Sequence, residues 1–227
     1  MGSLVGVRAC VFDAYGTLFD FASAAAACDS VPAARRAALT ALWRDKQLQY
    51  SWLRSLQGRY VDFWQVTGDA LDYALDSLDL ADVDRREALM ALYRRLSAFP
   101  EVSATLRVLR GAGLATAILS NGTPDMLAEA IAAAGLDGLF DAVLSVDALK
   151  VFKTDRRVYQ YALDRLGLAA REVAFLSSNG WDAYAASDFG LRVAWCNRNH
   201  QSRERLPGAP DFEIGSLAEL PALLGIG

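Results

Sequence analysis

Residues 7–17 read VRACVFDAYGT, a mainly apolar run that ends on an aspartate and passes into a glycine. Val7 to Phe12 is partly β-branched and has the apolar character of a strand buried on both faces. Asp13 follows it directly, and Gly16-Thr17 marks a turn. The stretch therefore predicts the first strand of a buried sheet, with a carboxylate at its end.

The same order of apolar strand, polar loop and helix recurs through the second half of the chain. Further strands are predicted at Leu114 to Leu119, Ala142 to Val146, Val173 to Leu176 and Arg192 to Cys196. Helices are predicted from Thr123-Pro124 to Gly135, from about Asp155 to Leu166, and up to Gly190. Alternating strands and helices favour a mainly parallel sheet covered on both faces, so the predicted fold class is α/β of the doubly wound type.

Residues 19–99 break this rhythm with apolar side chains at helical spacing. Asp84 followed by Glu87 fits a capping box, and the alanine run Ala22 to Ala27 favours helix over linker. We interpret the stretch as an all-helical cap inserted after the first strand. The predicted organisation is a core of residues 1–18 and 100–227, with the cap at residues 19–99.

The overall composition excludes several classes of protein. The 227 residues are 53% hydrophobic, enough to bury the core of one globular unit. The net charge is -4 and the basic residues are scattered, so no nucleic-acid partner is expected. No apolar stretch approaches the roughly 20 residues of a membrane span. Because the N-terminus also lacks the pattern of a signal peptide, we expect a cytoplasmic protein.

The cysteine and histidine content restricts the chemistry further. Cys10, Cys28 and Cys196 show no CxxC spacing, so buried free thiols are expected in place of a zinc site or a disulfide framework. His200 is the sole histidine and lies in a polar stretch near the end of the chain. A multi-histidine metal site and a Ser-His-Asp site are therefore not expected.

Polar side chains follow four of the predicted strands or the loops beyond them: Asp13, Ser120-Asn121, Lys153 and Ser177 to Asp182. Ligands of open α/β sheets bind outside the carboxyl ends of the strands. Each segment alone is weak evidence for a site, because a strand-end aspartate is often a turn residue and a loop lysine is usually solvated. Taken together, the four segments predict one site at one edge of the sheet.

Four segments resemble, in order, the motifs of the haloacid dehalogenase superfamily: FDAYGTLF at 12–19, LSNG at 119–122, VFK at 151–153 and SSNGWD at 177–182. The cap segment WRDKQLQYSWLR at 43–54 is similar to that of the L-2-haloacid dehalogenase branch, which is a more discriminating match. The resemblance implies a Rossmann-like core, a helical cap over the site, a small 2-haloacid as substrate and, commonly, a homodimer.

The resemblance also implies a covalent reaction on Asp13. Its carboxylate would attack C2 of a 2-haloalkanoic acid from behind, displace halide and form an ester with inversion of that centre. Lys153 would keep Asp13 ionised and supply the positive charge that Mg²⁺ gives the phosphatases of the superfamily. Thr17 and Ser177 would hold Asp13 in place by hydrogen bonds, although either could serve only as a capping residue.

The second step needs a base for water. Asp182, oriented by Asn179 and Lys153, is the natural candidate, although an aspartate at a helix start can be only an N-cap. Superfamily phosphatases carry a second aspartate two residues after the nucleophile, and Tyr15 stands there in this chain. A phenol with an ordinary pKa near 10 relays protons poorly and adds no negative charge for Mg²⁺. Neither a metal nor a cofactor is expected.

The halide site implied by the resemblance consists of Arg44, Asn121 and Trp181, because donors fixed before the reaction stabilise a departing anion best. From composition alone, Arg44 would be an exposed helix arginine, and Trp181 is equally consistent with plain core packing. The implied substrate-binding residues are Ser120, which would hold the substrate carboxylate, and the pocket residues Tyr15, Leu48, Phe63 and Tyr159, of which Tyr159 is equally consistent with core.

Two positions depart from the family pattern. Thr154 follows the motif lysine where proline is usual, so the loop carrying Lys153 is expected to be less rigid. Asp45 follows the cap arginine where glutamine is frequent, and an acid there would weaken anion binding or alter chain-length preference. Two other functions stay open: a magnesium-dependent small-molecule phosphatase of the same superfamily, and a catalytically silent binding protein.

Overall fold

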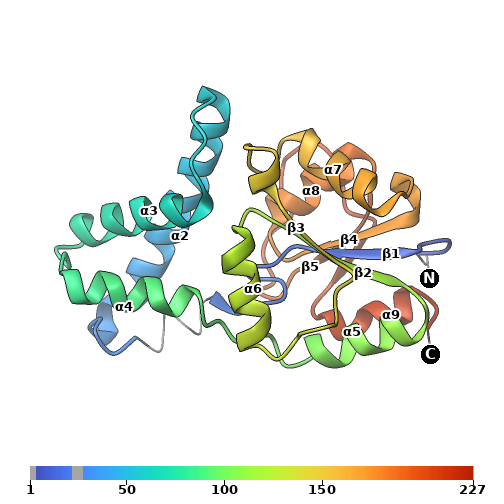
Figure 1. Cartoon of the computed structure of the whole chain (residues 1–227), viewed down its shortest axis with the longest axis horizontal. Helices are drawn as coiled ribbons and strands as arrows, with labels where there is room; N and C mark the ends of the chain where they lie inside the picture. Colours follow the sequence, from blue (N-terminus) through green and yellow to red (C-terminus); the bar gives the residue numbers. More distant parts are fainter. Residues whose placement is uncertain (1–3, 22–27, 227) are drawn as a thin grey trace.

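A computed structural model describes residues 4–21 and 28–226 and shows, within them, one six-stranded sheet (Figure 1). The strand order is β3-β2-β1-β4-β5-β6, and every neighbouring pair is parallel. The strands are β1 (Ala9–Phe12), β2 (Ala115–Ser120), β3 (Ala142–Ser145), β4 (Val173–Ser177), β5 (Arg192–Cys196) and β6 (Phe212–Ile214). The predicted doubly wound α/β fold is confirmed.

The central strand, β1, is apolar because both of its faces are covered. Val11 pairs in register with Ala117 of β2 and Phe175 of β4, and all three side chains are fully buried. Strands in such a position carry near-continuous apolar runs, which is why the sequence pattern found them. All five predicted strands are present with ends that differ by at most two residues, and β6 is an additional edge strand that was not predicted.

Helices cover both faces of the sheet, with α7 and α8 on one side and α5 and α9 on the other (Figure 1). Thr123 caps α6 by accepting a hydrogen bond from the Met126 N–H at 3.2 Å, and Gly190 ends α8 with a φ of 113°, as the sequence pattern predicted. The core helices are α5 (Val102–Gly111), α6 (Pro124–Ala133), α7 (Arg156–Leu166), α8 (Gly180–Phe189) and α9 (Leu220–Leu223).

The chain segment that connects β1 to α5 forms a helical insert, which lies beside the sheet (Figure 1). Its helices are α2 (Ala33–Gln57), α3 (Phe63–Ser77) and α4 (Val83–Tyr93). α2 and α3 are joined by the Trp43 indole, whose N–H donates to the Thr67 carbonyl at 2.8 Å. The Trp43 ring also packs on Tyr93 with centroids 5.7 Å apart. Aromatic burial between helices therefore gives the insert its own small core.

One helix start in the insert differs from the expectation. Asp82 is the N-cap of α4 and accepts from the Arg85 N–H at 2.8 Å. The predicted capping box of Asp84 and Glu87 is therefore wrong, because the helix begins earlier and Asp84 lies within its first turn. The predicted helix at Ala22 to Ala27 lies outside the described residues.

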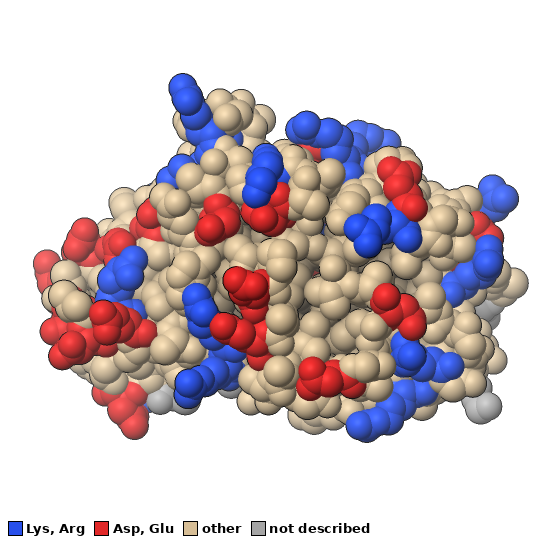
Figure 2. All heavy atoms as spheres, in the orientation of Figure 1, with Lys and Arg blue, Asp and Glu red and all other residues tan. Residues whose placement is uncertain are grey.

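Charged side chains of both signs are interspersed over the face shown in Figure 2, where no continuous basic stripe is seen. This distribution agrees with the scattered basic residues of the sequence. Over residues 4–21 and 28–226, no helix has the length and apolar character needed to cross a membrane.

Candidate active site

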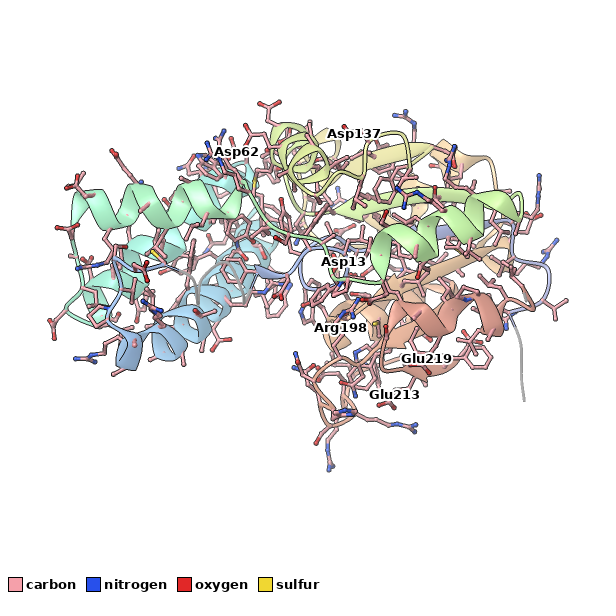
Figure 3. The ribbon with its side chains drawn as sticks, turned by 90° about the horizontal axis from the view of Figure 1, so that it is seen from below. Asp13, Asp62, Asp137, Arg198, Glu213 and Glu219 are labelled. Atoms are coloured by element: carbon pink, nitrogen blue, oxygen red, sulfur yellow. The ribbon has the colours of Figure 1, made fainter. Side chains whose placement is uncertain are left out.

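Asp13 lies where the sheet meets the helical insert, near the middle of the molecule (Figure 3). It follows β1, and its N–H donates to the Leu176 carbonyl of β4 at 2.8 Å. One carboxylate oxygen, Oδ2, accepts from the Thr17 hydroxyl at 2.9 Å and from Asn179 Nδ2 at 2.8 Å. The other, Oδ1, accepts from Lys153 Nζ at 3.0 Å. Donors on three separate segments therefore fix the orientation of this carboxylate.

Lys153 carries a fully buried ammonium, with 1% of its side chain exposed. Its Nζ lies 3.0 Å from Asp13 Oδ1 and 2.7 Å from Asp182 Oδ2. Burial disfavours the charged lysine, but the two carboxylates outweigh burial and raise the pKa of Lys153 above its ordinary value. The ammonium thus stays charged between two acids, as an internal counter-ion.

Asp182 lies in the first turn of α8, where the partial positive charge of the helix start favours a carboxylate. Besides Lys153, it is bound by the Tyr159 hydroxyl, which donates to Oδ1 at 2.8 Å. Burial, together with repulsion from Asp13, raises the pKa of Asp182, and Lys153 opposes that shift. A carboxylate with a raised pKa accepts a proton from water more readily, so Asp182 is suited to act as a base.

Two of the predicted contacts around these acids need correction. Ser177 does not bond to Asp13; its hydroxyl accepts from the Asn179 N–H at 3.2 Å and so shapes the loop. Asn179 does not bond to Asp182, because its amide nitrogen donates to Asp13 and to the Tyr15 carbonyl at 3.2 Å. The Tyr159 hydroxyl takes the place beside Asp182 that had been predicted for Asn179.

The predicted halide donors approach the site from two directions. Arg44 extends from α2 and donates through NH2 to Asn179 Oδ1 at 3.1 Å. Because Asn179 also bonds to Asp13, a single side chain separates the guanidinium from the Asp13 carboxylate. Asn121 follows β2, and its Oδ1 accepts from the Lys153 N–H at 3.0 Å. Since the oxygen of Asn121 is used in that bond, the amide nitrogen remains as its donor to an anion.

Trp181, the third predicted halide residue, has its ring against Trp52 of α2, with centroids 5.6 Å apart and planes at 80°. Both rings line a cavity of about 340 Å³ together with Thr154 and Leu206. This contact joins the helical insert to the segment that begins α8. The role of Trp181 toward halide stays a prediction.

Two of the predicted pocket residues, Tyr15 and Phe63, lie in a buried aromatic cluster. The Tyr15 ring lies 6.3 Å from that of Phe63 and 5.1 Å from that of Tyr93. A methyl group on Gly122 would come within 2.9 Å of the Tyr15 ring, so a larger residue there would force the ring to move. Burial raises the pKa of Tyr15 well above its ordinary value. The phenol therefore remains neutral and supplies no second carboxylate beside Asp13.

Ser120 and Leu48 are two further predicted substrate-binding residues. The Ser120 hydroxyl is buried and accepts from the Gly122 N–H at 3.1 Å, which holds the loop that follows β2. Leu48 is half-buried on α2, one turn after Arg44. A cleft of about 1000 Å³ reaches the site, and Tyr15, Arg44 and Asn179 are among the side chains that line it.

The charges of the site fit an ammonium better than a divalent metal. Lys153 Nζ already lies within hydrogen-bond distance of both carboxylates, so a metal ion between them would have to displace it. Over the described part of the chain, no group of three or more His, Cys, Asp or Glu side chains is arranged to hold a metal.

Sequence reasoning missed the contacts that connect the insert to the Lys153 loop. The Ser55 hydroxyl of α2 accepts from the Phe152 N–H at 3.0 Å. The Tyr60 hydroxyl donates to Asp147 Oδ1 at 2.9 Å, and its ring stacks on Phe152 with centroids 4.9 Å apart. The peptide bond between Lys153 and Thr154 is cis. No sequence signal marks Ser55 or Tyr60, since both look like ordinary helix and loop residues.

Comparison with known proteins agrees with this geometry. The haloacid dehalogenase-like hydrolase family matches residues 7–190. The chain is 45% identical over 219 residues to (S)-2-haloacid dehalogenase 1 of Pseudomonas sp. (strain CBS-3), covering 96% of each chain. The structure of L-2-haloacid dehalogenase from Xanthobacter autotrophicus with chloropropionic acid covalently bound superposes with a TM-score of 0.90 at 42% identity, covering 96% of this chain and 98% of that one. The chain belongs to the haloacid dehalogenase-like hydrolases, in the L-2-haloacid dehalogenase branch.

Proposed function

We propose that this chain is an (S)-2-haloacid dehalogenase, which hydrolyses L-2-haloalkanoic acids to D-2-hydroxyalkanoic acids and halide. The observation that carries the proposal is the buried row of Asp13, Lys153 and Asp182, in which one ammonium serves two carboxylates at 3.0 and 2.7 Å. The row supplies a nucleophile, its counter-ion and a base. Relatives of the same name at 45% identity support the assignment.

In the first step, an oxygen of Asp13 attacks C2 of the substrate opposite the carbon–halogen bond. A carbon–oxygen bond forms, the halogen leaves with the bonding electrons, and the centre is inverted. Arg44 and Asn121 donate hydrogen bonds to the developing halide, and the loop around Ser120 receives the substrate carboxylate. Donors that are already in place cost no reorganisation when the charge appears.

In the second step, water attacks the carboxyl carbon of the Asp13 ester. Asp182 accepts the proton of that water, and its raised pKa suits it to do so. The bond between the carboxyl carbon and the ester oxygen breaks, and the leaving oxygen takes up the proton held by Asp182 to give the hydroxy acid. The new Asp13 carboxyl then releases the second proton of the water to solvent, which restores the carboxylate. Lys153 stabilises the negative charge that moves between the two acids.

Oxygen-18 labelling tests the covalent route. Enzyme in excess reacts once with L-2-chloropropionate in oxygen-18 water, and the product and the peptide that contains Asp13 are analysed by mass spectrometry. Because the first hydroxyl oxygen comes from Asp13, the product should be mostly unlabelled and the peptide labelled. Fully labelled product with an unlabelled peptide would show direct attack by water and make Asp13 a general base.

The metal-free reading is tested separately. Halide release from L-2-chloropropionate should persist in excess EDTA, because Lys153 supplies the cation from within the chain. Loss of activity that Mg²⁺ restores would favour the magnesium-dependent phosphatase reading. Turnover of neither 2-haloacids nor phosphate esters would favour a silent binding protein.

We further propose that the chain forms a homodimer in the cytoplasm. Leu53 and Leu56 lie one turn apart on α2 with 45% and 84% of their surface exposed, and burial of these two side chains against a second copy would favour pairing. Three cysteines are free and buried, which is usual in reducing compartments. Light scattering that gives the monomer mass at micromolar concentration would overturn the dimer.

A further inference from the structure

Gln47 carries a buried amide on α2, next to the guanidinium of Arg44. It is 1% exposed, although glutamine is normally a surface residue. Its Oε1 accepts from Arg44 NH1 at 2.8 Å. Its Nε2 donates to the Thr67 hydroxyl at 2.7 Å and to the Tyr93 hydroxyl at 3.0 Å. Every polar atom of this side chain is therefore engaged.

Thr67 determines which way the amide faces. Its hydroxyl has one proton, which it donates to the Phe63 carbonyl at 2.6 Å. Toward Gln47 it can therefore only accept, which requires Nε2 on that side and Oε1 on the side of Arg44. The reversed amide would place acceptor against acceptor at Thr67 and donor against donor at Arg44. A buried polar group with a single satisfied orientation holds its neighbour rigidly.

We propose that Gln47 is a positioning residue that aims the Arg44 guanidinium at the departing halide. The inference rests on the proposed function, because it assumes that Arg44 binds halide. Gln47 accepts a hydrogen bond from NH1 of the guanidinium and Asn179 accepts one from NH2, so the planar group is held from both sides. Asn179 also bonds to Asp13 at 2.8 Å, so the same chain of contacts ends on the nucleophile.

The arrangement has a chemical consequence for the first step only. A guanidinium that is fixed in advance stabilises the halide as charge develops, whereas a mobile one must be ordered at that moment. Chloride concentrates its charge more than bromide and is the poorer leaving group. Loss of positioning should therefore slow chloride release more than bromide release. Ester hydrolysis, which occurs at Asp13 and Asp182, should be little affected.

Gln47→Met tests the inference, with Gln49→Met as the matched control. Methionine keeps the length and volume of glutamine but cannot accept from Arg44. Gln49 lies on the same helix, is exposed, and accepts only from Lys46 at 2.8 Å in the described structure. Single-turnover halide release from L-2-chloropropionate should fall by about 10- to 100-fold in Gln47→Met, the range typical of a misplaced catalytic contact, and stay unchanged in Gln49→Met.

The leaving-group comparison separates positioning from a general structural defect. In Gln47→Met, the ratio of chloride to bromide release rates should fall, and KM should change less than the rate of halide release. An equal loss for both halides would overturn the inference. Thr67→Val removes the acceptor that orients the amide and should change the ratio in the same direction by a smaller factor. It decides the question if Gln47→Met does not fold.

Arg44→Ala distinguishes failure of the inference from failure of the proposed function. If Gln47 acts through Arg44, adding Gln47→Met to Arg44→Ala should slow halide release no further. Additive losses would mean that Gln47 acts elsewhere and would overturn the inference alone. Near-normal halide release in Arg44→Ala would overturn the halide role of Arg44 and, with it, the inference.

Discussion

Replacing Lys153 with methionine should remove activity and make the stability of the protein depend steeply on pH. Both carboxylate oxygens lie within 3.0 Å of the same nitrogen, so they are less than about 6 Å apart. Without the ammonium, two negative charges at that separation repel by about 3 kcal/mol at an effective dielectric constant of about 20. Breaking a buried pair by removing one partner typically costs about 3–5 kcal/mol.

The pH dependence follows from which state binds the extra proton. In Lys153→Met the folded protein favours protonation of one of the two acids, because that ends the repulsion. The free energy of unfolding should therefore be highest in acid and fall as the pH rises toward neutrality. Urea denaturation at pH 5 and pH 7.5 measures this difference. The deficit relative to the natural protein should be smaller at pH 5.

Two variants control the Lys153 measurement. Lys150→Met removes a lysine that pairs with Asp147 but has 62% of its side chain exposed. This substitution should lower the free energy of unfolding by less than about 1 kcal/mol. Asp182→Asn in the Lys153→Met background removes one of the facing charges and should recover much of the loss at pH 7.5. A Lys153→Met protein as stable as the Lys150 variant, or one that is weaker at pH 5 than at pH 7.5, would refute the reasoning.

Three further outcomes are expected. Tyr159→Phe removes the hydroxyl that donates to Asp182, so in single-turnover kinetics it should slow ester hydrolysis more than halide release, and equal slowing of both steps would contradict this. It should also lower the free energy of unfolding, measured by urea denaturation, by about 1.5–3 kcal/mol. Asp182→Asn should release about one equivalent of halide and then stop, with the Asp13 peptide heavier by the acyl group in mass spectrometry, whereas steady turnover would point to another base. The pKa values of Lys153, Tyr15 and Tyr159 are raised above their ordinary 10 to 10.5, so the free energy of unfolding should be maintained below about pH 10 and fall above it; a flat profile from pH 9 to 11 would exclude this linkage.

The sequence pattern predicted the elements that are long or apolar and missed those that are short or polar. Arg192–Cys196 was predicted with its exact bounds because a buried parallel strand leaves a continuous apolar run. Phe212–Ile214 has three residues and pairs on one side only, so it carries no pattern that distinguishes it from a loop. The Asp84 start was misplaced because Asp82, two residues earlier, is an equally good N-cap, and in the structure its side chain accepts from the Arg85 N–H.

The composition of the site was easier to predict than its hydrogen bonds. Asp13, Lys153 and Asp182 were expected together because strand ends in a parallel sheet meet at one edge. Which donor binds which oxygen depends on side-chain directions, so Tyr159 and Asn179 could not be assigned to the correct acid beforehand. Gln47 was missed because a helix glutamine gives no sign in the sequence that its amide is buried.

The bond from Arg44 of the helical insert to Asn179 of the core has a consequence for substrate selection. Asn179 also holds Asp13, so a displacement of Arg44 disturbs the donor that aligns the nucleophile. A haloacid too bulky for the cleft beside Arg44 would enter it and push this side chain aside, so its carbon–halogen bond would meet a misaligned oxygen. Discrimination among substrates would then appear in turnover more than in affinity, and oversized haloacids would behave as inhibitors.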